Sequence, residues 1–281
     1  MKDLSGKTAV ITGAASGIGR AMAERFGAEG MNLVLADIDP DALKKAETEL
    51  SSVAPAVASR RTDVSSGADV QALADLALEK FGAVHLVCNN AGVGIGGALW
   101  DMTEKDWQWL LGVNLWGVIH GVRTFVPIML KQGGEAHIVN TASGAGLDAR
   151  PWLGMYAASK YAVVGLSESL RGELAMSGSQ VGVSVLCPVV VNTRIGESER
   201  NRPQELSGVG EAEVPAAAAA FGEAFRAALA AGLPPPQVAE AVLDAVLNNR
   251  LYILTHAETV DRVRARTERI LNDANARPLA G

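Results

Sequence analysis

The chain is poor in several residue types that would indicate particular classes of protein. Its 281 residues include only two cysteines and four histidines, and aromatic residues make up 5%. Cys88 and Cys187 each lie in an apolar run, so buried free thiols are expected rather than a disulfide. The histidines are scattered without the spacing of metal ligands. The sequence therefore predicts no metal centre, and the histidines are expected to be structural or solvated.

Clusters of basic charge and long apolar runs are missing as well. The formal net charge is −6, and the Lys and Arg residues are spread along the chain, which leaves no basic stripe for nucleic acid. No apolar run reaches the roughly eighteen residues needed to cross a bilayer. The start "MKDLSGKTAVITG" has no signal-peptide pattern. We therefore expect a cytoplasmic protein that binds neither nucleic acid nor a membrane.

Short apolar runs alternate with segments of helical period along most of the chain. Strands are predicted at 7–12, 32–36, 56–62, 84–88, 136–141, 181–187 and 250–254. Helices are predicted at about 17–29, 40–50, 67–81, 103–130, 155–177, 236–248 and 257–274. This alternation is typical of an α/β fold with helices on both faces of a parallel sheet. Residues 1–281 are therefore predicted to form one doubly wound domain with seven strands.

The segment 194–235 interrupts this alternation. It contains "TRIGESERNRP", an alanine-rich run and the triplet "PPP". An insertion of this length between a strand and a helix usually has a function. It is predicted to be a substrate lid with an alanine-rich helix. The alternatives are a surface excursion and a contact within an oligomer.

A glycine-rich turn follows the first predicted strand. In "TGAASGIGR", Gly13, Gly17 and Gly19 lack the side chains that would hold the backbone away from a pyrophosphate. The free N–H groups at the start of the next helix favour such an anion. An acidic residue, Asp37, closes the second strand, as in dinucleotide-binding units. The sequence therefore predicts a Rossmann-type dinucleotide site.

Five motifs in order resemble the short-chain dehydrogenase/reductase family. They are "TGAASGIG", "NNAG" at 89–92, Asn114, Ser143 and "YAASK", and they cover nearly all of residues 4–256. The resemblance implies cofactor contacts from Gly13, Ser16, Gly17, Ile18, Gly19, Asp37, Asp63, Val64, Asn90, Ala91, Gly92, Tyr156, Lys160, Pro188, Val191 and Thr193. The stretch "NTRIGESERNRP" also resembles its counterpart in bacterial enzymes of this family that oxidise benzylic alcohols of lignin-type aryl ethers.

Asp37 indicates which nicotinamide cofactor is bound. A carboxylate accepts hydrogen bonds from the ribose hydroxyls of NAD but repels the 2′-phosphate of NADP. Ser16 and Ile38 stand where NADP-preferring relatives often carry Arg or Lys. The sequence therefore favours NAD over NADP. The basic residues that could counter this preference are Arg20, Arg60 and Arg61.

Tyr156 and Lys160 are four residues apart, so both side chains lie on one face of a helix. An isolated tyrosine titrates near ~10, and a base for pH 7–8 needs a pKa lower by about 2–3 units. A positive charge ~4 Å away contributes about 4 kcal/mol at an effective dielectric of ~20. Lys160 is therefore predicted to lower the pKa of Tyr156.

The family resemblance implies a role for each catalytic residue. Tyr156 would be the general acid and base, and Ser143 would orient the substrate oxygen. Lys160 would also hold the nicotinamide ribose, and Asn114 would position a water that relays the proton. The alternatives are that Ser143 and Tyr156 only cap and pack, and that Asn114 distorts its helix by bonding to the backbone.

One position departs from the family pattern. The family usually has Pro-Gly after the sixth strand, whereas "CPVVVNT" has Val189 in place of the glycine. A β-branched residue disfavours positive φ, so the local turn is expected to differ. We still expect Pro188, Val191 and Thr193 to contact the nicotinamide carboxamide.

The segment before Tyr156 indicates the substrate. Leu147, Trp152 and Met155, together with an apolar lid, predict a bulky, apolar or aromatic secondary alcohol or ketone rather than a sugar. Trp152 could instead pack at a subunit contact. A homo-oligomer, a dimer or a tetramer, is implied because relatives commonly pair the two long helices.

Three functions are compatible with these residues. The leading one is an NAD-dependent dehydrogenase for bulky secondary alcohols. The second is an NADPH-dependent carbonyl reductase. The third is a non-catalytic, NAD-binding regulator, although the complete set of catalytic residues argues against it.

Overall fold

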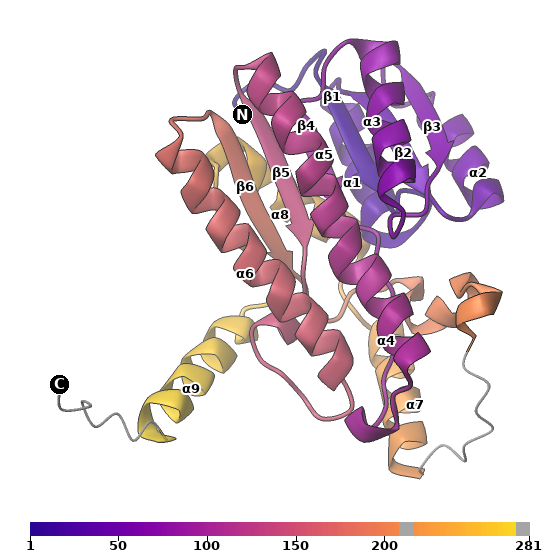
Figure 1. The fold of residues 1–281 in the computed structure, drawn as a ribbon, viewed down its shortest axis with the longest axis vertical. Helices are drawn as coiled ribbons and strands as arrows, with labels where there is room; N and C mark the ends of the chain where they lie inside the picture. The colour runs from indigo at the N-terminus through magenta and orange to yellow at the C-terminus, as the bar shows by residue number, and fades with distance from the viewer. Residues whose placement is uncertain (208–215, 274–281) are drawn as a thin grey trace.

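A seven-stranded parallel sheet forms the centre of the computed structural model, which describes residues 1–207 and 216–273 (Figure 1). Its strands are β1 (Thr8–Thr12), β2 (Asn32–Asp37), β3 (Val57–Arg61), β4 (Leu86–Asn89), β5 (Ala136–Thr141), β6 (Val181–Cys187) and β7 (Tyr252–Leu254). The strand order is β3-β2-β1-β4-β5-β6-β7, and every neighbouring pair is parallel. The predicted seven-stranded α/β fold is confirmed.

Helices cover both faces of the sheet. They are α1 (Gly17–Ala28), α2 (Pro40–Leu50), α3 (Gly67–Phe81), α4 (Glu104–Leu111), α5 (Gly117–Gln132), α6 (Gly154–Met176), α7 (Ala216–Ala230), α8 (Pro235–Asn248) and α9 (Glu258–Asp273). On one face α1 packs against α8, and on the other α3 packs against α5 (Figure 1). The α9 helix was predicted to reach residue 274, which lies outside the described residues.

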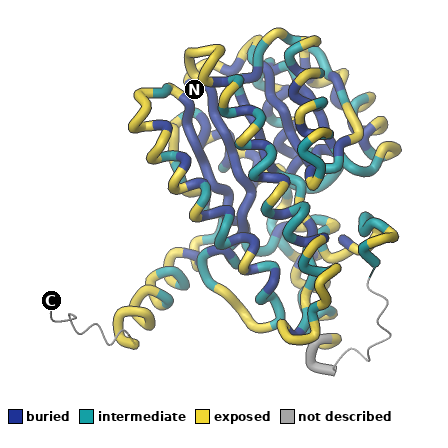
Figure 2. The backbone as a smooth tube through the Cα atoms, viewed as in Figure 1, coloured by how far each residue is buried: buried dark blue, intermediate teal, exposed yellow. Residues whose placement is uncertain are grey.

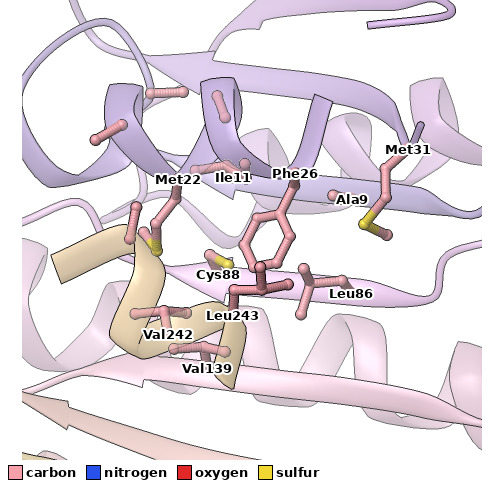
Figure 3. Packing of buried hydrophobic residues seen from close by; sticks show 14 of the residues in the cluster. Ala9, Ile11, Met22, Phe26, Met31, Leu86, Cys88, Val139, Val242 and Leu243 are labelled. Atoms are coloured by element: carbon pink, nitrogen blue, oxygen red, sulfur yellow. The ribbon is translucent and has the colours of Figure 1, made fainter. Parts of the chain in front are cut away.

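The strands are buried between these two helical layers. All residues of β1, β5 and β6 are buried, and Figure 2 shows them in dark blue. In Figure 3, Met22 and Phe26 of α1 lie beside Val242 and Leu243 of α8 in one apolar cluster. Cys88 belongs to the same cluster, and Cys187 is buried on the other side, both as free thiols. The expectation for the cysteines is therefore confirmed.

The helix predicted at 103–130 is interrupted. The α4 helix is followed by a π-helical turn, η2 (Gly112–Trp116), before α5 begins. Within it, Asn114 Oδ1 accepts a hydrogen bond from the Val93 amide at 2.8 Å, and its Nδ2 donates to the Val93 carbonyl at 2.9 Å. The helical segment predicted at 103–130 is present, and the distortion considered for Asn114 in the sequence analysis takes the form of this π-helical turn.

The combined run Glu104–Gln132 is the one stretch among the described residues that is long and apolar enough to cross a membrane. Two of its apolar side chains, Phe125 and Met129, are fully buried among residues of the sheet and of α3 and α6. A helix that covers a sheet can have the same length and composition as a membrane span. We therefore interpret this run as a layer of the fold.

The chain leaves the sheet after β6 and returns at Leu233 to the point where it left. Val191 and Leu233 form a parallel bridge, so the intervening chain is an excursion with its two ends side by side. Among the described residues, this excursion contains the 3-10 turns η4 (Arg194–Asn201) and η5 (Gln204–Leu206) and the helix α7. The alanine-rich helix expected within the segment corresponds to α7.

Candidate active site

A cleft of about 600 Å³ lies at the carboxyl ends of the strands, where the strand order reverses between β1 and β4. In open parallel sheets such a point is the usual ligand site. The cleft brings together most of the cofactor and catalytic residues that the sequence indicated. Those on its wall are Gly13, Ser16, Gly17, Ile18, Asp37, Asp63, Val64, Asn90, Ala91, Gly92, Tyr156, Lys160, Pro188 and Thr193.

The glycine turn has the shape that a pyrophosphate requires. Gly13 and Gly17 have φ values of 65° and 56°, in the left-handed region that other residues avoid. A Cβ on Gly19 would clash with the Gly13 carbonyl oxygen, so Gly19 lets α1 approach the end of β1. Ser16 caps α1 without a side-chain hydrogen bond, which leaves the first N–H groups for an anion. The turn therefore fits the diphosphate of a dinucleotide.

Asp37 is held in place by the backbone around it. Its Oδ2 accepts a hydrogen bond from the Ala15 amide at 3.0 Å, and its Oδ1 accepts one from the Asp39 amide at 3.2 Å. The carboxylate thereby links the glycine turn to the start of α2 and lines the cleft. Its position suits the adenosine ribose of a dinucleotide.

The arginines that could favour NADP are placed elsewhere. Arg20 pairs with two glutamates, at 2.8 Å and 3.1 Å. Arg60 and Arg61 belong to β3 and are not on the cleft wall. Among the described residues, the Lys and Arg residues on the cleft wall are Lys160, Arg194 and Arg200, and Arg61 is the backbone partner of Asp37 in the sheet.

Thr12, at the end of β1, organises the neighbouring loop. Its Oγ1 accepts hydrogen bonds from the amides of Asn90 and Ala91, at 2.9 Å and 3.0 Å. The Asn90 Nδ2 in turn donates to the Thr12 carbonyl at 3.0 Å. Sequence reasoning did not single out Thr12, because a threonine at a strand end has no distinctive local signal. The "NNAG" loop is fixed against β1 through this residue.

Asn114 connects the cleft to α6. Its Nδ2 lies 3.4 Å from the Ser159 Oγ, and that hydroxyl donates to the Tyr156 carbonyl at 2.7 Å. A Cβ on Gly92 would lie 3.4 Å from Asn114 Oδ1 and 3.7 Å from Lys160 Nζ, so both side chains lie near this glycine. Asn114 thus has the backbone-bonding role considered as an alternative, at a point beside Lys160.

Lys160 and Tyr156 project from α6 into the cleft. The Lys160 Nζ donates to the Thr141 carbonyl at 2.9 Å and lies 5.6 Å from the centroid of the Tyr156 ring. Burial lowers the pKa of Lys160 to about 8. Burial also raises the pKa of Tyr156, and the nearby Ser143 hydroxyl acts in the opposite direction.

Burial is the main influence of the protein's own groups on the pKa of Tyr156. Lys160 directs its ammonium at the Thr141 carbonyl, and burial disfavours its charge. The lowering of the tyrosine pKa by Lys160 stays a prediction. With protein groups alone, the phenol of Tyr156 is stabilised in its neutral form.

Ser143 lies behind the cleft wall at the end of β5. Its Oγ accepts a hydrogen bond from the Ala145 amide at 3.1 Å and donates to the Pro188 carbonyl at 3.3 Å. Pro188 also accepts a hydrogen bond from the Gly144 amide at 2.7 Å. These contacts join the loops after β5 and β6 next to Tyr156.

Val189 fits the turn that follows β6. Among the described residues, the non-glycine positions with positive φ are Trp152 and Asn249, so Val189 keeps an ordinary backbone conformation. Pro188 and Thr193 line the cleft, whereas Val191 is buried in the apolar core beneath it. Val191 is therefore placed as a packing residue of the sheet edge.

The three substrate residues predicted before Tyr156 are not on the cleft wall. Leu147 packs against an apolar cluster behind β5 and β6, and Met155 is buried. The carbonyl of Trp152 accepts a hydrogen bond from the Gly97 amide at 2.9 Å, in a left-handed turn. Their placement depends on how the loop folds back onto the sheet, which the apolar character of the residues did not reveal.

Some cleft residues were not predicted from the sequence. They come from α4 and η2: Gln108, Trp109, Leu111, Gly112, Val113 and Trp116. The remaining members lie in the loop after "NNAG" or in the segment 194–235 predicted as a substrate lid: Val93, Arg194, Ile195, Ser198, Arg200, Asn201, Pro203 and Leu206.

A glycine turn for a diphosphate, a carboxylate at the ribose position and a Tyr–Lys pair in one cleft define a pyridine-nucleotide-dependent oxidoreductase. The chain belongs to the short-chain dehydrogenase/reductase family. The family model described as "short chain dehydrogenase" matches residues 7–204. The recognition made from the sequence motifs is therefore confirmed.

Individual relatives are similar over almost the whole chain. The CLA biosynthesis dehydrogenase/reductase of Lactiplantibacillus plantarum is 35% identical, over 97% of this chain and 96% of its own length. The C alpha-dehydrogenase of a Sphingobium species is 36% identical, over 92% of this chain and 83% of its own. A short-chain dehydrogenase from Burkholderia phymatum, solved in complex with NAD, is 49% identical, with a TM-score of 0.94 and full coverage of both chains.

Proposed function

We propose that the protein is an NAD-dependent oxidoreductase that interconverts a bulky, apolar or aromatic secondary alcohol and its ketone, with Tyr156 as general acid and base. One observation carries this proposal. Tyr156 and Lys160 of α6 open into the same cleft as the glycine turn and Asp37, although these residues are far apart in the sequence.

NAD is proposed as the cofactor rather than NADP. The Asp37 carboxylate on the cleft wall would accept hydrogen bonds from the ribose hydroxyls, and it would repel a 2′-phosphate. The similarity to a relative solved with NAD supports the same choice. When bound, NAD supplies the hydride chemistry, and the protein holds it through the glycine turn, Asp37 and the cleft wall.

The protein's own residues would handle the proton. Tyr156 takes the hydroxyl proton of the alcohol during oxidation and gives it back to the carbonyl oxygen during reduction. Burial favours the neutral phenol, which is the form that donates. Ser143 lies beside Tyr156 and would orient the substrate oxygen, and Asn114 next to Lys160 would position the proton relay.

Apolar residues on the cleft wall support an apolar substrate. Leu147, Trp152 and Met155, which the sequence had indicated, do not line the cleft. Val93, Ile195 and Leu206 line it, and they come from three different segments. Benzylic and other bulky secondary alcohols are the class we propose, in keeping with the similarity to the C alpha-dehydrogenase.

We also propose that the protein acts in the cytoplasm as a homodimer or homotetramer. Leu130 of α5 and Met176 of α6 are exposed apolar side chains on the two helices expected to pair between subunits. Size-exclusion chromatography with light scattering tests the oligomer directly.

The test is a screen of NAD⁺ and NADP⁺ reduction over aliphatic, benzylic and steroid-like secondary alcohols. Oxidation with NAD⁺, lost in Tyr156→Phe, is the expected result. A strong preference for NADP(H) would support the alternative of an NADPH-dependent carbonyl reductase. Binding of NADH without oxidation or reduction of any substrate would support a non-catalytic regulator.

A further inference from the structure

The first part of the excursion after β6 crosses the cleft. We call residues 194–206 the strap. Figure 1 shows it in orange beside α4, and the strap turn η5 contacts that helix. Members of the strap and of α4 line the same cleft, among them Ile195, Pro203 and Trp109. The strap therefore forms a cover over the cleft between the end of β6 and α4.

The near end of the strap is fixed close to the glycine turn. Thr193, immediately before the strap, lies so close to Gly17 that a Cβ on Gly17 would be 3.1 Å from the Thr193 methyl carbon. Ser198 accepts a hydrogen bond from the Gly94 amide at 2.9 Å and is itself buried. This end is thus tied to the loops after β1 and β4.

The far end is fixed by one arginine. Arg202 has a side chain that is only 8% exposed, and its guanidinium lies 2.5 Å from an Asp106 carboxylate oxygen. The same guanidinium lies over the Trp109 ring, 5.0 Å from its centroid, and its Nε donates to the Leu206 carbonyl at 2.8 Å. Arg202 therefore binds α4 on one side and the end of the strap on the other.

Asp106 is anchored independently of Arg202. It belongs to the capping box at the start of α4, where its carboxylate accepts a hydrogen bond from the Thr103 amide at 2.8 Å. The arginine thus meets a carboxylate that a rigid helix end already holds. A partly buried charge pair of this kind leaves an unpaired charge when either partner is removed, so its loss disfavours the closed arrangement.

We propose that the Arg202–Asp106 pair is a latch that holds the strap over the bound dinucleotide, and that Arg202 is a positioning residue that sets the rate of NADH release. This inference rests on the proposed function, because it takes NAD as the occupant of the cleft. A dinucleotide held by the glycine turn has the strap as part of its enclosure. Opening of such covers limits turnover in many enzymes.

The experiment measures NADH binding and release directly, by energy transfer from tryptophan to NADH in equilibrium titrations and stopped flow. The variants are Arg202→Gln, Arg202→Lys and Asp106→Asn, the last of which keeps an oxygen for the α4 cap. The matched control is Glu199→Gln, because Glu199 also pairs with Arg202, at 3.3 Å, but is 65% exposed.

We expect Arg202→Gln and Asp106→Asn to speed NADH release and raise its dissociation constant by about 10-fold or more, with Arg202→Lys in between. Glu199→Gln should resemble the wild type. A single-turnover measurement of hydride transfer should be unchanged. Since a purely structural role would lower the Tm and leave release unaltered, wild-type release rates in the folded variants would overturn the proposal.

The experiment distinguishes a failure of the latch proposal from a failure of the proposed function. If the wild type fails to bind NADH, the proposed function is wrong and the latch with it. If the wild type binds NADH and oxidises an alcohol through Tyr156, but Asp106→Asn and Arg202→Lys release NADH normally, only the latch is wrong.

Discussion

The two ends of the cleft are built in different ways. At the nucleotide end, small residues and backbone groups make the contacts, as in the glycine turn and in the amides that hold Asp37. At the catalytic end, side chains join separate segments of the chain, as in the bonds from Lys160 to the Thr141 carbonyl and from Asn114 to the Val93 carbonyl. The first end depends on close backbone approach, and the second on buried polar side chains. A substitution at one end should therefore impair the function of that end and leave the function of the other end unchanged.

The largest effect is expected at the catalytic end, from Tyr156→Phe. Removing the phenolic proton donor should lower kcat by about 10²- to 10⁴-fold in both directions of the reaction. The dissociation constant for NADH should stay close to that of the wild type, because the nucleotide end is untouched. Steady-state kinetics and NADH titration measure the two effects. An equal loss of NADH binding would show that the two ends are not independent.

The nucleotide end is tested by Gly19→Ala. The added methyl group would clash with the Gly13 carbonyl oxygen and push α1 away from β1. We expect NADH affinity to fall by about 10- to 100-fold, which corresponds to about 1.4–2.7 kcal/mol. The control is Gly172→Ala on α6, where a Cβ meets no atom within 4 Å. Similar NADH affinity in both variants would contradict the proposed role of the turn.

Asp37→Ala tests whether this carboxylate of the nucleotide end selects NAD over NADP. Losing the carboxylate removes acceptors for the ribose hydroxyls and the repulsion of a 2′-phosphate. The ratio of kcat/KM for NAD⁺ over NADP⁺ should fall by about 10-fold or more. Asp39→Asn is the matched control, since the Asp39 carboxylate caps α2 through the amides of Asp41 and Ala42. An unchanged ratio in Asp37→Ala would argue against NAD selection by this residue.

The last prediction concerns stability alone and not activity, at His137 on β5, which lies between β4 and β6 in the sheet. Burial lowers the pKa of His137, on β5, to about 3 from an ordinary 6.5. Between those values the unfolded chain binds more protons, so stability is complete above pH 6.5 and is lost as the pH falls towards 3. The free energy of unfolding should fall by up to about 1.4 kcal/mol per pH unit in this window.

Urea denaturation at several pH values measures this slope. His137→Gln should flatten it, because no imidazole is left to protonate, although the variant loses some stability at neutral pH. His120→Gln, which replaces the histidine that stacks on Trp116, serves as the control and should keep the slope. A wild type with equal stability at pH 4 and pH 7 would contradict the prediction.

The sequence-based prediction was most successful for features that depend on residues close together in the sequence. Each predicted strand is present, because buried parallel strands are short continuous apolar runs. The residues of the glycine turn and of the "YAASK" motif were recognisable because their spacing is fixed by one turn and one helix face. Asp37 was identified because it stands immediately after the last residue of the second predicted strand.

The failures all involve contacts between distant segments. The distortion of the helix at Asn114 was considered from the sequence, but its partner Val93 was not identified, because apolar periodicity does not register that pairing. Leu147 and Met155 have the apolar character of pocket residues, but the loop turns them into the core. The pKa of Tyr156 was estimated from the charge of Lys160 alone, and the opposing effect of burial was not included.

By itself, the sequence determined the family, the parallel sheet and the residues of the nucleotide turn, since all of these are specified by short motifs and local periodicity. Only the tertiary structure decided the protonation tendencies of Tyr156 and Lys160, because desolvation depends on everything packed around them. It also decided which residues join the strap to α4. Arg202 and Asp106 are 96 residues apart, and only folding brings their charges together.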